Sequence, residues 1–502
     1  MWHPGFPSAG VNTVTATDDE TGLSAHSNPI QVTSDKVSLH PYWADLHGQS
    51  EETIGTNTIE DYFTFARDYA LLDICAHQGN DFQITDDFWR TINRITKKFN
   101  ERGVFVTFPG YEWSGNTPLG GDRNVYFASE GGHITRSSTE LLPGKRSRYE
   151  DSPTAAKLFK NLKRQRIETF VFAHVGGRYA ELSIHDSDIE LAVEIHSAWG
   201  TFEWLLEDAL KRGYCIGVCG NSDGHKCRPG TSYPGATRFG SLGGLTCILS
   251  EKLDRSSILQ ALKSRHFYAT TGNRSLIDVQ LKTGDGRSAM MGDRIQIGTE
   301  IPILCVSAVG TAPIESVTVR NGLDTLKTLR PYRDNELGNR VKILWGGAEV
   351  MGRARIVQWD GHLRIHNNRI VNATAINFWN ANQPLKQRGQ CYLQWQSITS
   401  GGVAGAIIEL EKLNTGSIAI EMLQVNIKVD VETIGIEPII SSFGGLQKRI
   451  EIYRLPDQQC SCELSFNLPL SGMHKSDNQI YLRITQEDGH MAWTSPIYLA
   501  SS

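Results

Sequence analysis

The sequence predicts an α/β domain followed by an all-β domain. The first expectation rests on short apolar runs that alternate with amphipathic helical patterns between residues 37 and 275. The second rests on period-two segments separated by Gly, Asn and Asp turns between residues 276 and 502, where the helical pattern disappears. A chain of 502 residues is also too long for one ordinary core, which favours several domains.

Residues 1–36 contain two short β-prone runs around an Asp-Glu-Thr-Gly turn, in "NTVTATDDETGLSAHSNPIQVTS". A lone hairpin is marginally stable in water. We therefore expect this segment to pack against the rest of the chain, or to be the remnant of a longer N-terminal module.

The region 37–275 alternates helices and strands. "TIEDYFTFARDYA" opens with a Thr58 cap, and "DDFWRTINRITKKFNERG" has apolar residues at helical spacing and stops at Gly103. Further helices are expected over 153–166, 202–212 and 255–265. The strand candidates are "LLDICAH", "GVFVTFPGYEW", "TFVFAHV", "LAVEIHS", "YCIGVCGNSDGH" and "GLTCILS". This alternation predicts a parallel sheet, open or closed into a barrel.

The region 276–502 reads as an all-β module, most simply a sandwich. Segments such as "RVKILWGG", "ARIVQWDGHLRIHNNRI" and "NQIYLRITQ" alternate with period two. Clustered His, Asp and Glu are scarce there, so we expect the chemistry to lie in the α/β region.

The composition narrows the range of partners. A net charge of −5 argues against a general nucleic-acid or membrane-surface role, and no apolar run is long enough to cross a bilayer. "MWHPGFPSAG" has no signal-peptide pattern. The nine cysteines are odd in number and several lie in apparent strands, which suits reduced thiols. We expect a cytoplasmic protein, or a periplasmic one if the natural N-terminus is missing.

Ionisable residues collect where the α/β strands end. The C-terminal ends of parallel strands converge on one face, where active sites are built. Any one such residue could equally be a core histidine, a helix cap or a turn residue. As a set they predict a site for one or more divalent metals. The set is His47, His77, Glu112, His174, Glu194 with His196, and Asp223 with His225.

Five motifs resemble the PHP superfamily, named for polymerase and histidinol phosphatase, and its domain-of-unknown-function branch numbered 3604. They are "YWADLHGQS", "FPGYEWSG", "FAHV", "VEIHSAWGTFEW" and "GNSDGHKCRPG", followed by "GLTCILS" and "ILQALKSRHFYATTG". The resemblance implies a distorted (β/α)7 barrel over 37–275, with manganese, zinc or iron at the strand C-termini. It also implies phosphoesterase or other metal-dependent hydrolase activity.

The resemblance also implies individual ligands. His47 matches the first His of an H-x-H motif, and Glu112 the carboxylate that commonly bridges metals. His174 matches the mid-barrel histidine, and Asp223 with His225 the closing D-x-H pair. Asp45 would then orient the His47 ring, since a metal-bound imidazole usually needs such a partner.

The sequence departs from the family pattern at three places. Gln49 replaces the second His of H-x-H, "HQGND" has Asn80 where a ligand is expected, and "GGDRNVYF" has Asp122 where relatives have His. Three exchanged ligands cannot hold three metals in the usual way, so we expect one or two ions per chain. The ligand pool is His47, His77, Glu112, His174, Asp223 and His225.

The exchanged positions are free to contact substrate. Gln49, Asn80 and Asp81 can offer hydrogen bonds to a substrate at the face where the strand ends converge. Three arginines lie on loops near ligand-bearing strand ends, and an arginine fork suits carboxylate or phosphate oxygens, although each could equally make a surface salt bridge. The arginines are Arg123, Arg178 and Arg274. We therefore expect an anionic substrate, such as a phosphate ester or a uronate saccharide.

Three functions fit these residues, and the oligomeric state is left open. In a hydrolase, water activated by the metal attacks phosphorus or a carbonyl, and His196 or Asp122 moves the proton; His196 is alternatively a ligand. In a metal-assisted lyase acting on uronate saccharides, His196 or Tyr179 is the base. Gln49 and Asn80 suggest a third function, a non-catalytic binding protein with a decayed metal site. The retained Glu112, His174, Asp223 and His225 count against it.

Overall fold

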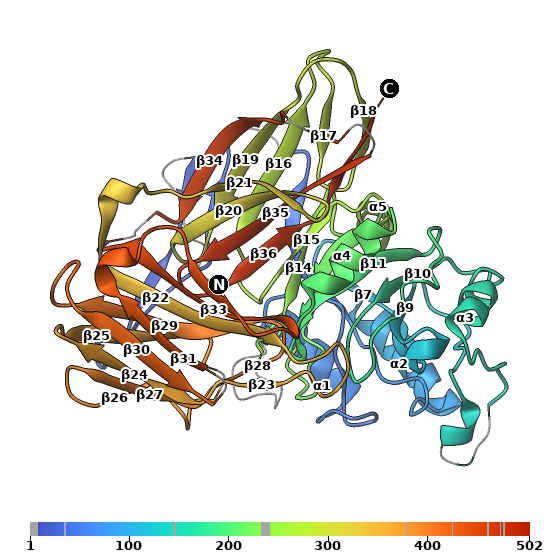
Figure 1. Ribbon diagram of the computed structural model, residues 1–502. Coiled ribbons are helices and arrows are strands. Elements are labelled where there is room, and N and C mark those ends of the chain that lie inside the picture. Colours follow the sequence, from blue (N-terminus) through green and yellow to red (C-terminus); the bar gives the residue numbers. More distant parts are fainter. Residues whose placement is uncertain are drawn as a thin grey trace.

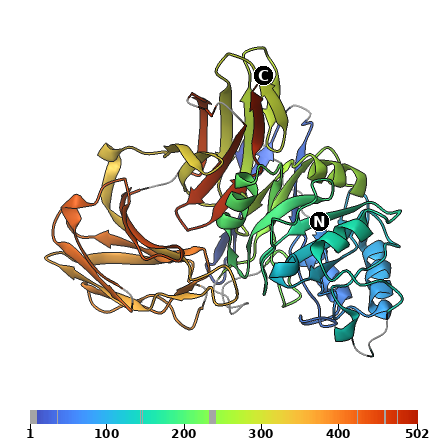
Figure 2. The same ribbon diagram turned by 45° about the vertical axis from the view of Figure 1, so that its right-hand side comes forward.

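The computed structural model describes residues 9–34, 37–142, 144, 147–231, 241–378, 380–423, 425–458, 461–471, 473–474 and 477–501. These form an α/β part, a β part next to it, and a separate β-sandwich (Figures 1 and 2). None of the helices in the described ranges combines the length and apolar character needed to cross a bilayer.

The N-terminal segment makes two small antiparallel ladders. β1 (Gly10–Asn12) pairs with β4 (Ile30–Val32), and β2 (Thr15–Thr17) pairs with β3 (Ser24–His26). The Asp-Glu-Thr-Gly turn joins β2 to β3, with Gly22 at a φ of +68°. The β2–β3 strands are exposed on both faces, so this hairpin buries little surface of its own.

The first α/β sheet contains a parallel trio extended on one side by two strands, each antiparallel to the strand before it. Its strands are β5 (His40–Asp45), β6 (Ile74–Ala76), β7 (Val106–Phe108), β14 (Leu245–Ser250) and β15 (Phe267–Thr270). β5, β6 and β7 are parallel, whereas β14 runs antiparallel to β5 and to β15. The connecting helices are α1 (Ile59–Thr64), its π-helical continuation η1 (Phe65–Tyr69), α2 (Asp86–Phe99) and α5 (Arg255–Lys263). Thr58 caps α1 with its side chain, as the sequence predicts.

The second α/β sheet provides most of the candidate site. Its strands are β8 (Gly110–Ser114), β9 (Asp122–Phe127), β10 (Thr169–Ala173), β11 (Glu190–Ser197), β12 (Gly200–Thr201) and β13 (Gly217–Gly220). β10, β11 and β13 are parallel, and β9 is antiparallel to both β8 and β10. The helical segments on this side are η2 (Thr117–Leu119), η3 (Thr139–Leu141), α3 (Ala155–Leu162) and α4 (Glu203–Lys211).

The α/β part is less regular than a (β/α)7 barrel. In the described ranges no ladder joins β7 to β8 or β13 to β14; isolated bridges at Gly48–Gly224 and Asn80–Glu112 connect the two sheets instead. The expectation of a wholly parallel sheet is wrong for β8–β9, β9–β10 and β14. Short connections explain the first of these, because a parallel crossover needs a dozen or more residues, and 115–121 provide only a tight loop.

The region after residue 275 forms two β modules, where the sequence predicts one sandwich. The first module has β16 (Leu276–Lys282), β17 (Ser288–Met290), β18 (Arg294–Ile297), β19 (Ile303–Val309), β20 (Ile314–Asn321), β21 (Asp324–Leu329), β34 (Glu463–Pro469), β35 (Asn478–Gln486), β36 (Met491–Thr494) and β37 (Ile497–Ser501). β36 pairs with β15, so this module continues the first α/β sheet across the expected boundary at 275/276. The end of the chain therefore closes against the α/β part.

The second module is a sandwich inserted between β21 and β34, seen at the left of Figure 1. One five-stranded sheet contains β25 (Ile370–Ile376), β29 (Val403–Leu410), β22 (Leu337–Ala348), β33 (Leu446–Pro456) and β32 (Ile439–Ser442). The other contains β26 (Lys386–Gln387), β27 (Tyr392–Trp395), β24 (Gly361–His366), β30 (Ser417–Met422) and β31 (Val425–Asp430). Short β23 (Val357–Gln358) pairs with β28 (Ile398–Thr399), and η5 (Asp334–Glu336) and η6 (Val431–Thr433) are single turns. Trp345 and Trp395 stack at 4.7 Å in the core between the two sheets.

Candidate metal centre

Seven ionisable side chains meet where the two α/β sheets approach each other. They are His47, Glu112, Asp122, His174, Glu194, Asp223 and His225. Two trios have ligand atoms that all lie within 4.8 Å of one another: His47, His174 and Glu194, and Glu112, Asp122 and His174. Because these residues come from six different strands or strand ends, with Asp223 and His225 together after β13, the sheets themselves set the geometry.

Glu194 fixes the orientation of the His47 ring. His47 Nδ1 lies 3.1 Å from Glu194 Oε1, and Asn221 Nδ2 donates to Glu194 Oε2 at 2.6 Å. The carboxylate can only accept, which assigns the proton to Nδ1. His47 Nε2 is then directed at the cluster, 3.3 Å from Asp223 Oδ1 and 3.8 Å from Glu112 Oε2.

His174 stands against His47 with ring centroids 4.5 Å apart and planes at 81°. Its Nε2 lies 3.7 Å from Glu112 Oε1, and both of its ring nitrogens are buried with no hydrogen-bond partner. His47 Nε2 and Asp223 Oδ1 are in the same condition. Buried polar atoms without partners are costly and rare, and imidazole nitrogens beside carboxylate oxygens suit manganese, zinc or iron. The residues therefore fit a divalent cation.

The charges of the cluster are strongly coupled. Burial alone would lower the pKa of His47, but Asp223 and Glu194 raise it well above its usual value. Burial works against ionisation of Glu112 too, yet His174 and His47 hold the pKa of Glu112 well below its ordinary value. Burial and Glu112 raise the pKa of Asp122 to about 6. Protons are thus concentrated on the imidazoles, where a bound cation would replace them.

Asp223 and His225 form the outer edge of the cluster. Asp223 has a φ of +46°, a left-handed conformation that Asp adopts more readily than most residues, and its N–H donates to the His47 carbonyl at 2.8 Å. His225 Nε2 lies 3.6 Å from Asp223 Oδ1, and its side chain is 20% exposed.

Asp45 does not orient the His47 ring as the sequence predicts; it binds backbone groups instead. It accepts from the backbone N–H groups of His47 at 3.3 Å, Ser222 at 2.9 Å and Gly230 at 2.9 Å, and does not touch the His47 ring. Asp45 therefore ties the 222–230 loop to the end of β5, and Glu194 orients the ring.

His77 lies to one side of the cluster and belongs to neither trio. Its Nε2 is 2.9 Å from Ser50 Oγ, and its ring packs edge-on against Tyr62 and Phe88. Burial lowers the pKa of His77 to about 3. His77 Nδ1 is also buried without a hydrogen-bond partner, but the ring lies against α1 and the start of α2 and outside both trios, so its role as a ligand stays a prediction.

His196 faces away from the cluster. β11 has a bulge here, so Glu194 and His196 pair with consecutive residues of β13 and do not share one face. His196 Nδ1 lies 2.9 Å from Thr201 Oγ1, and burial lowers the pKa of His196 to about 4. The ring lines a cavity of about 40 Å³ shared with Thr399 of the sandwich. The expected acid–base role of His196 therefore has no geometric support, whereas Asp122 lies within the cluster.

The three predicted polar contacts divide into two kinds. Gln49 Nε2 donates to Asn80 Oδ1 at 3.2 Å and approaches Glu112 Oε2 at 3.5 Å, so Gln49 and Asn80 lie at the rim. Asp81 instead accepts from the backbone N–H of Ser114 and from Ser137, and burial raises the pKa of Asp81 to about 7. Asp81 therefore holds the segments around Ser114 and Ser137 together.

The three predicted arginines also separate. Arg178 Nε donates to Asp122 Oδ1 at 2.6 Å, with Nη2 4.0 Å from Glu112 Oε1, which places it at the rim. Arg123 is fully buried; it donates to Glu190 at 2.8 Å and to nearby carbonyls, so it has no donor to offer a substrate. Arg274 donates to the Ala70 carbonyl ahead of β6, at the opposite end of the sheet from the cluster. The expected substrate role fits Arg178 and is unsupported for Arg123 and Arg274.

Two important side chains lie outside the predicted ligand pool. Glu194, in "VEIHS", belongs to the predicted strand-end set but not to the pool of ligands, and His196 was the residue of that motif expected to act. Arg355 comes from the sandwich and donates to the Gly176 carbonyl at 2.7 Å. No local sequence signal identifies it, because the contact joins distant parts of the chain.

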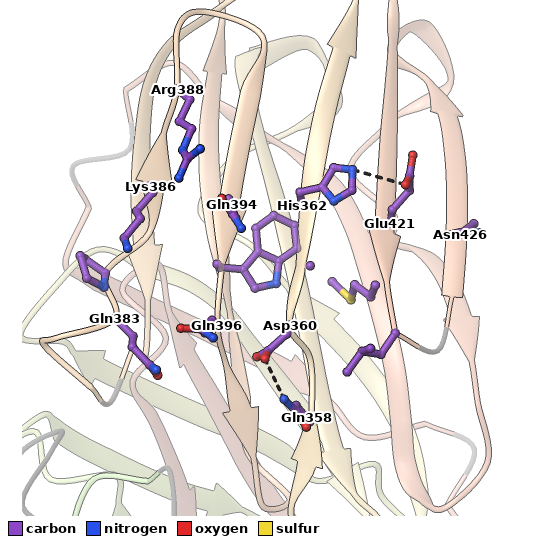
Figure 3. Close-up of a pocket in the computed structure, with 15 residues that line it drawn as sticks. Gln358, Asp360, His362, Gln383, Lys386, Arg388, Gln394, Gln396, Glu421 and Asn426 are labelled. Carbon is purple, nitrogen blue, oxygen red and sulfur yellow. Dashed lines mark hydrogen bonds and ion pairs between the residues drawn. The ribbon is translucent and has the colours of Figure 1, made fainter.

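A groove of about 610 Å³ lies on the outer face of the β26-β27-β24-β30-β31 sheet (Figure 3). His362, Gln394, Glu421 and Asn426 point outward there, and His362 Nε2 lies 3.4 Å from Glu421 Oε2. None of its lining residues belongs to the metal cluster. The groove is therefore a surface feature of the sandwich.

Residues 14–177 match the family described as protein of unknown function, DUF3604. The resemblance to the family numbered 3604 is thus confirmed over this stretch. Similar proteins, each described as uncharacterized, occur in Chlamydia pneumoniae, 28% identical over 340 residues, and Chlamydia muridarum, 26% identical over 362 residues. These alignments cover 62% and 66% of this chain and 52% and 55% of the relatives, so the chain spans about half the length of the curated relatives it matches.

Among solved structures, the chain is similar to a two-domain protein from Bacteroides vulgatus, described as containing a predicted PHP-like metal-dependent phosphoesterase. The sequence identity is 12% and the TM-score is 0.34, with 78% of this chain and 96% of the other chain covered.

Proposed function

We propose that the chain is a metal-dependent hydrolase of PHP type that cleaves an anionic substrate, with a phosphoester as the default. The main support comes from three buried imidazole nitrogens, His47 Nε2 and both nitrogens of His174. None of them has a hydrogen-bond partner, although four buried carboxylates surround them. We infer one or two ions of manganese, zinc or iron, held by His47, Glu112, His174, Asp223 and His225, with Asp122 beside them as the group that transfers protons. A bound cation would lower the pKa of water and offset negative charge on the substrate.

The protein's own side chains supply orientation and proton transfer. Glu194 holds the His47 tautomer that directs Nε2 at the cluster. Arg178 lies beside Asp122 at the rim, where its guanidinium can hold an anionic oxygen. The Asp122 carboxyl, with its pKa raised to about 6 by burial and Glu112, can hold or release a proton near neutral pH.

The two alternative functions are less well supported. A uronate lyase loses its first candidate base, because His196 faces the other cavity. Its second, Tyr179, packs edge-on against Trp204 at 5.7 Å. A decayed site would have no reason to keep several buried ligand atoms without partners, since each costs about 1–3 kcal/mol.

The test combines metal analysis with a substrate panel. Purified protein should contain a transition metal and release phosphate from phosphoesters in a Mn²⁺-dependent manner. His174→Ala should lose the bound metal and all such activity, because His174 belongs to both trios. His362→Ala, in the outer groove of the sandwich, is the matched control and should keep both.

Two outcomes would contradict the proposal. Wild-type protein with no bound metal and no metal-dependent thermal shift would show that the cluster is not a metal site. Absorbance of an unsaturated uronate without phosphate release would replace hydrolysis by the lyase reaction.

A further inference from the structure

The sandwich reaches the metal cluster through the segment after β22. Residues 349–355 form a turn closed by the Glu349 N–H, which donates to the Arg355 carbonyl at 2.8 Å. Arg355 Nη2 donates to the Gly176 carbonyl at 2.7 Å, and Arg353 Nε donates to the Gly177 carbonyl at 3.2 Å. The sandwich therefore rests directly on the loop that follows His174.

The loop after His174 lies directly against the side chains of the metal cluster. A Cβ atom at Gly176 would stand 3.1 Å from His174 Cε1, 3.4 Å from Asp122 Oδ2 and 3.6 Å from Asp223 Oδ2. One glycine thus separates the Arg355 hydrogen bond from three cluster side chains. The Trp199 ring lies near both the cluster and Arg355. Its centroid is 6.2 Å from that of the His225 ring and 5.8 Å from the Arg355 guanidinium carbon.

Arg355 is a buried cation that forms no ion pair within the described part of the chain. Its residue exposure is 3%, its Nε donates to the Gly352 carbonyl at 2.8 Å, and its guanidinium lies 5.1 Å from the Phe202 ring. Nη1 is buried and has no hydrogen-bond partner, and no carboxylate in the described part of the chain is close enough to form an ion pair with Arg355. Buried charges are normally paired, so a partner is missing from this site.

The nearby acidic groups are already committed to the cluster. Burial lowers the pKa of Arg355 to about 10, against the opposing effect of Asp122 and Asp223. Asp122 is bound to Arg178, and Asp223 lies against His47 and His225. The guanidinium is attracted to this negative charge without forming an ion pair with it, so Nη1 remains able to donate to an anion carried by a ligand.

We propose that Arg355 is the residue of the sandwich that binds the anionic oxygen of the substrate beside the metal cluster. This rests on the proposed function and extends it: the sandwich completes the active site. Nη1 would donate to an oxygen of a phosphate or a carboxylate, while Nε and Nη2 stay bonded to Gly352 and Gly176. Two oxyanion classes share this chemistry, the phosphoester and the uronate.

The experiment measures oxyanion binding to the metal-loaded protein by calorimetry, with inorganic phosphate and glucuronate as separate probes. Arg355→Met keeps an unbranched apolar stem over Phe202 but removes the charge. It should weaken binding roughly tenfold or more, since a hydrogen bond to a charged group contributes about 1.5–3 kcal/mol. Metal content should not change. Arg355→Lys should recover part of the affinity, and the probe that binds identifies the oxyanion class.

Arg364→Met is the matched control, because Arg364 is an exposed cation of the same sandwich that lies over Tyr392. It should bind the oxyanion within about twofold of wild type, a difference below 0.5 kcal/mol. If Arg355→Met fails to fold, Arg355→Gln decides, because it also removes the charge but keeps a polar group: undiminished oxyanion affinity in that variant would overturn the proposal.

Other results separate this proposal from the proposed function. Wild-type affinity in Arg355→Met, or no binding of either probe to metal-loaded wild type, would overturn the role of Arg355 whatever the reaction. Arg355-dependent oxyanion binding without any hydrolysis would contradict the hydrolase and leave the anion site standing.

Discussion

At the scale of single residues, the candidate metal centre depends on the buried carboxylate of Glu194. Glu194 accepts from both the His47 ring and the Asn221 amide, and is only 1% exposed. Second partners of metal-bound histidines fix the tautomer and the ring plane. Glu194 therefore contributes to metal affinity through the orientation of the His47 ring.

Glu194→Gln should lower metal affinity roughly 10- to 100-fold while the fold persists, since the amide keeps an acceptor but loses the charge that favours the Nδ1 proton. A metal titration followed by calorimetry measures this. The control is Glu190→Gln, another buried glutamate of β11, which pairs with Arg123 and His185. It should reduce stability and leave metal affinity unchanged; equal losses of affinity in both variants would contradict the orienting role.

The candidate residues were predictable where a strand ends and unpredictable where a local irregularity or a distant contact decides. The rule that strand ends converge brings together His47, His174 and Asp223, which follow β5, β10 and β13. It fails for His196, since a bulge in β11 turns that side chain to the other face. It says nothing of Arg355, whose place is set by packing between modules.

At the scale of elements, the connection after β10 holds the centre together. Only one of its two glycines is required by space: a Cβ at Gly176 would lie 3.1 Å from His174 Cε1, whereas one at Gly177 would meet only the end of the Arg353 side chain. Adjacent positions in one loop therefore differ in what a methyl group would displace. His174 is held by its neighbours in the cluster, while Arg353 is exposed and can swing away.

Gly176→Ala should shift the His174 ring and weaken metal affinity by roughly tenfold, because small misplacements of ligands and reacting groups are costly. Gly177→Ala should behave like wild type. Metal affinity and the thermal midpoint of both variants provide the measurement. The same affinity in both variants would mean that the loop tolerates the methyl group and does not set the ring position.

At the scale of the whole molecule, the number of β modules could not be predicted from the strand pattern. The period-two signal identifies strands after residue 275 but not their partners, and pairings such as β15 with β36 or β20 with β35 join residues far apart in sequence. The same limit explains why the sandwich was not recognised as an insertion between β21 and β34. Its docking onto the His174 loop and onto Thr201 is a tertiary property.

A buried charged network joins the sandwich to the neighbouring β module. Glu315 on β20 lies 2.5 Å from Lys342 Nζ on β22, and Tyr453 on β33 donates to it at 2.7 Å. Lys342 also donates to the Glu487 carbonyl at 3.0 Å. Glu315 and Lys342 are almost fully buried, so removing either partner would leave the other charge uncompensated.

This network predicts a loss of stability in acid. Burial raises the pKa of Glu315, but Lys342 and Arg330 more than offset this and hold it below its usual value. A carboxyl whose folded-state pKa is lowered stabilises the fold above its unfolded value of about 4.3, and that contribution is lost as pH falls through the folded value. Glu315→Gln should cost about 3–5 kcal/mol at pH 7 and flatten the decline below pH 4.3. Urea unfolding at several pH values tests both, with Glu421→Gln, an exposed partner of His362, expected to change stability by less than about 1 kcal/mol. An acid decline as steep in Glu315→Gln as in wild type would place its origin elsewhere.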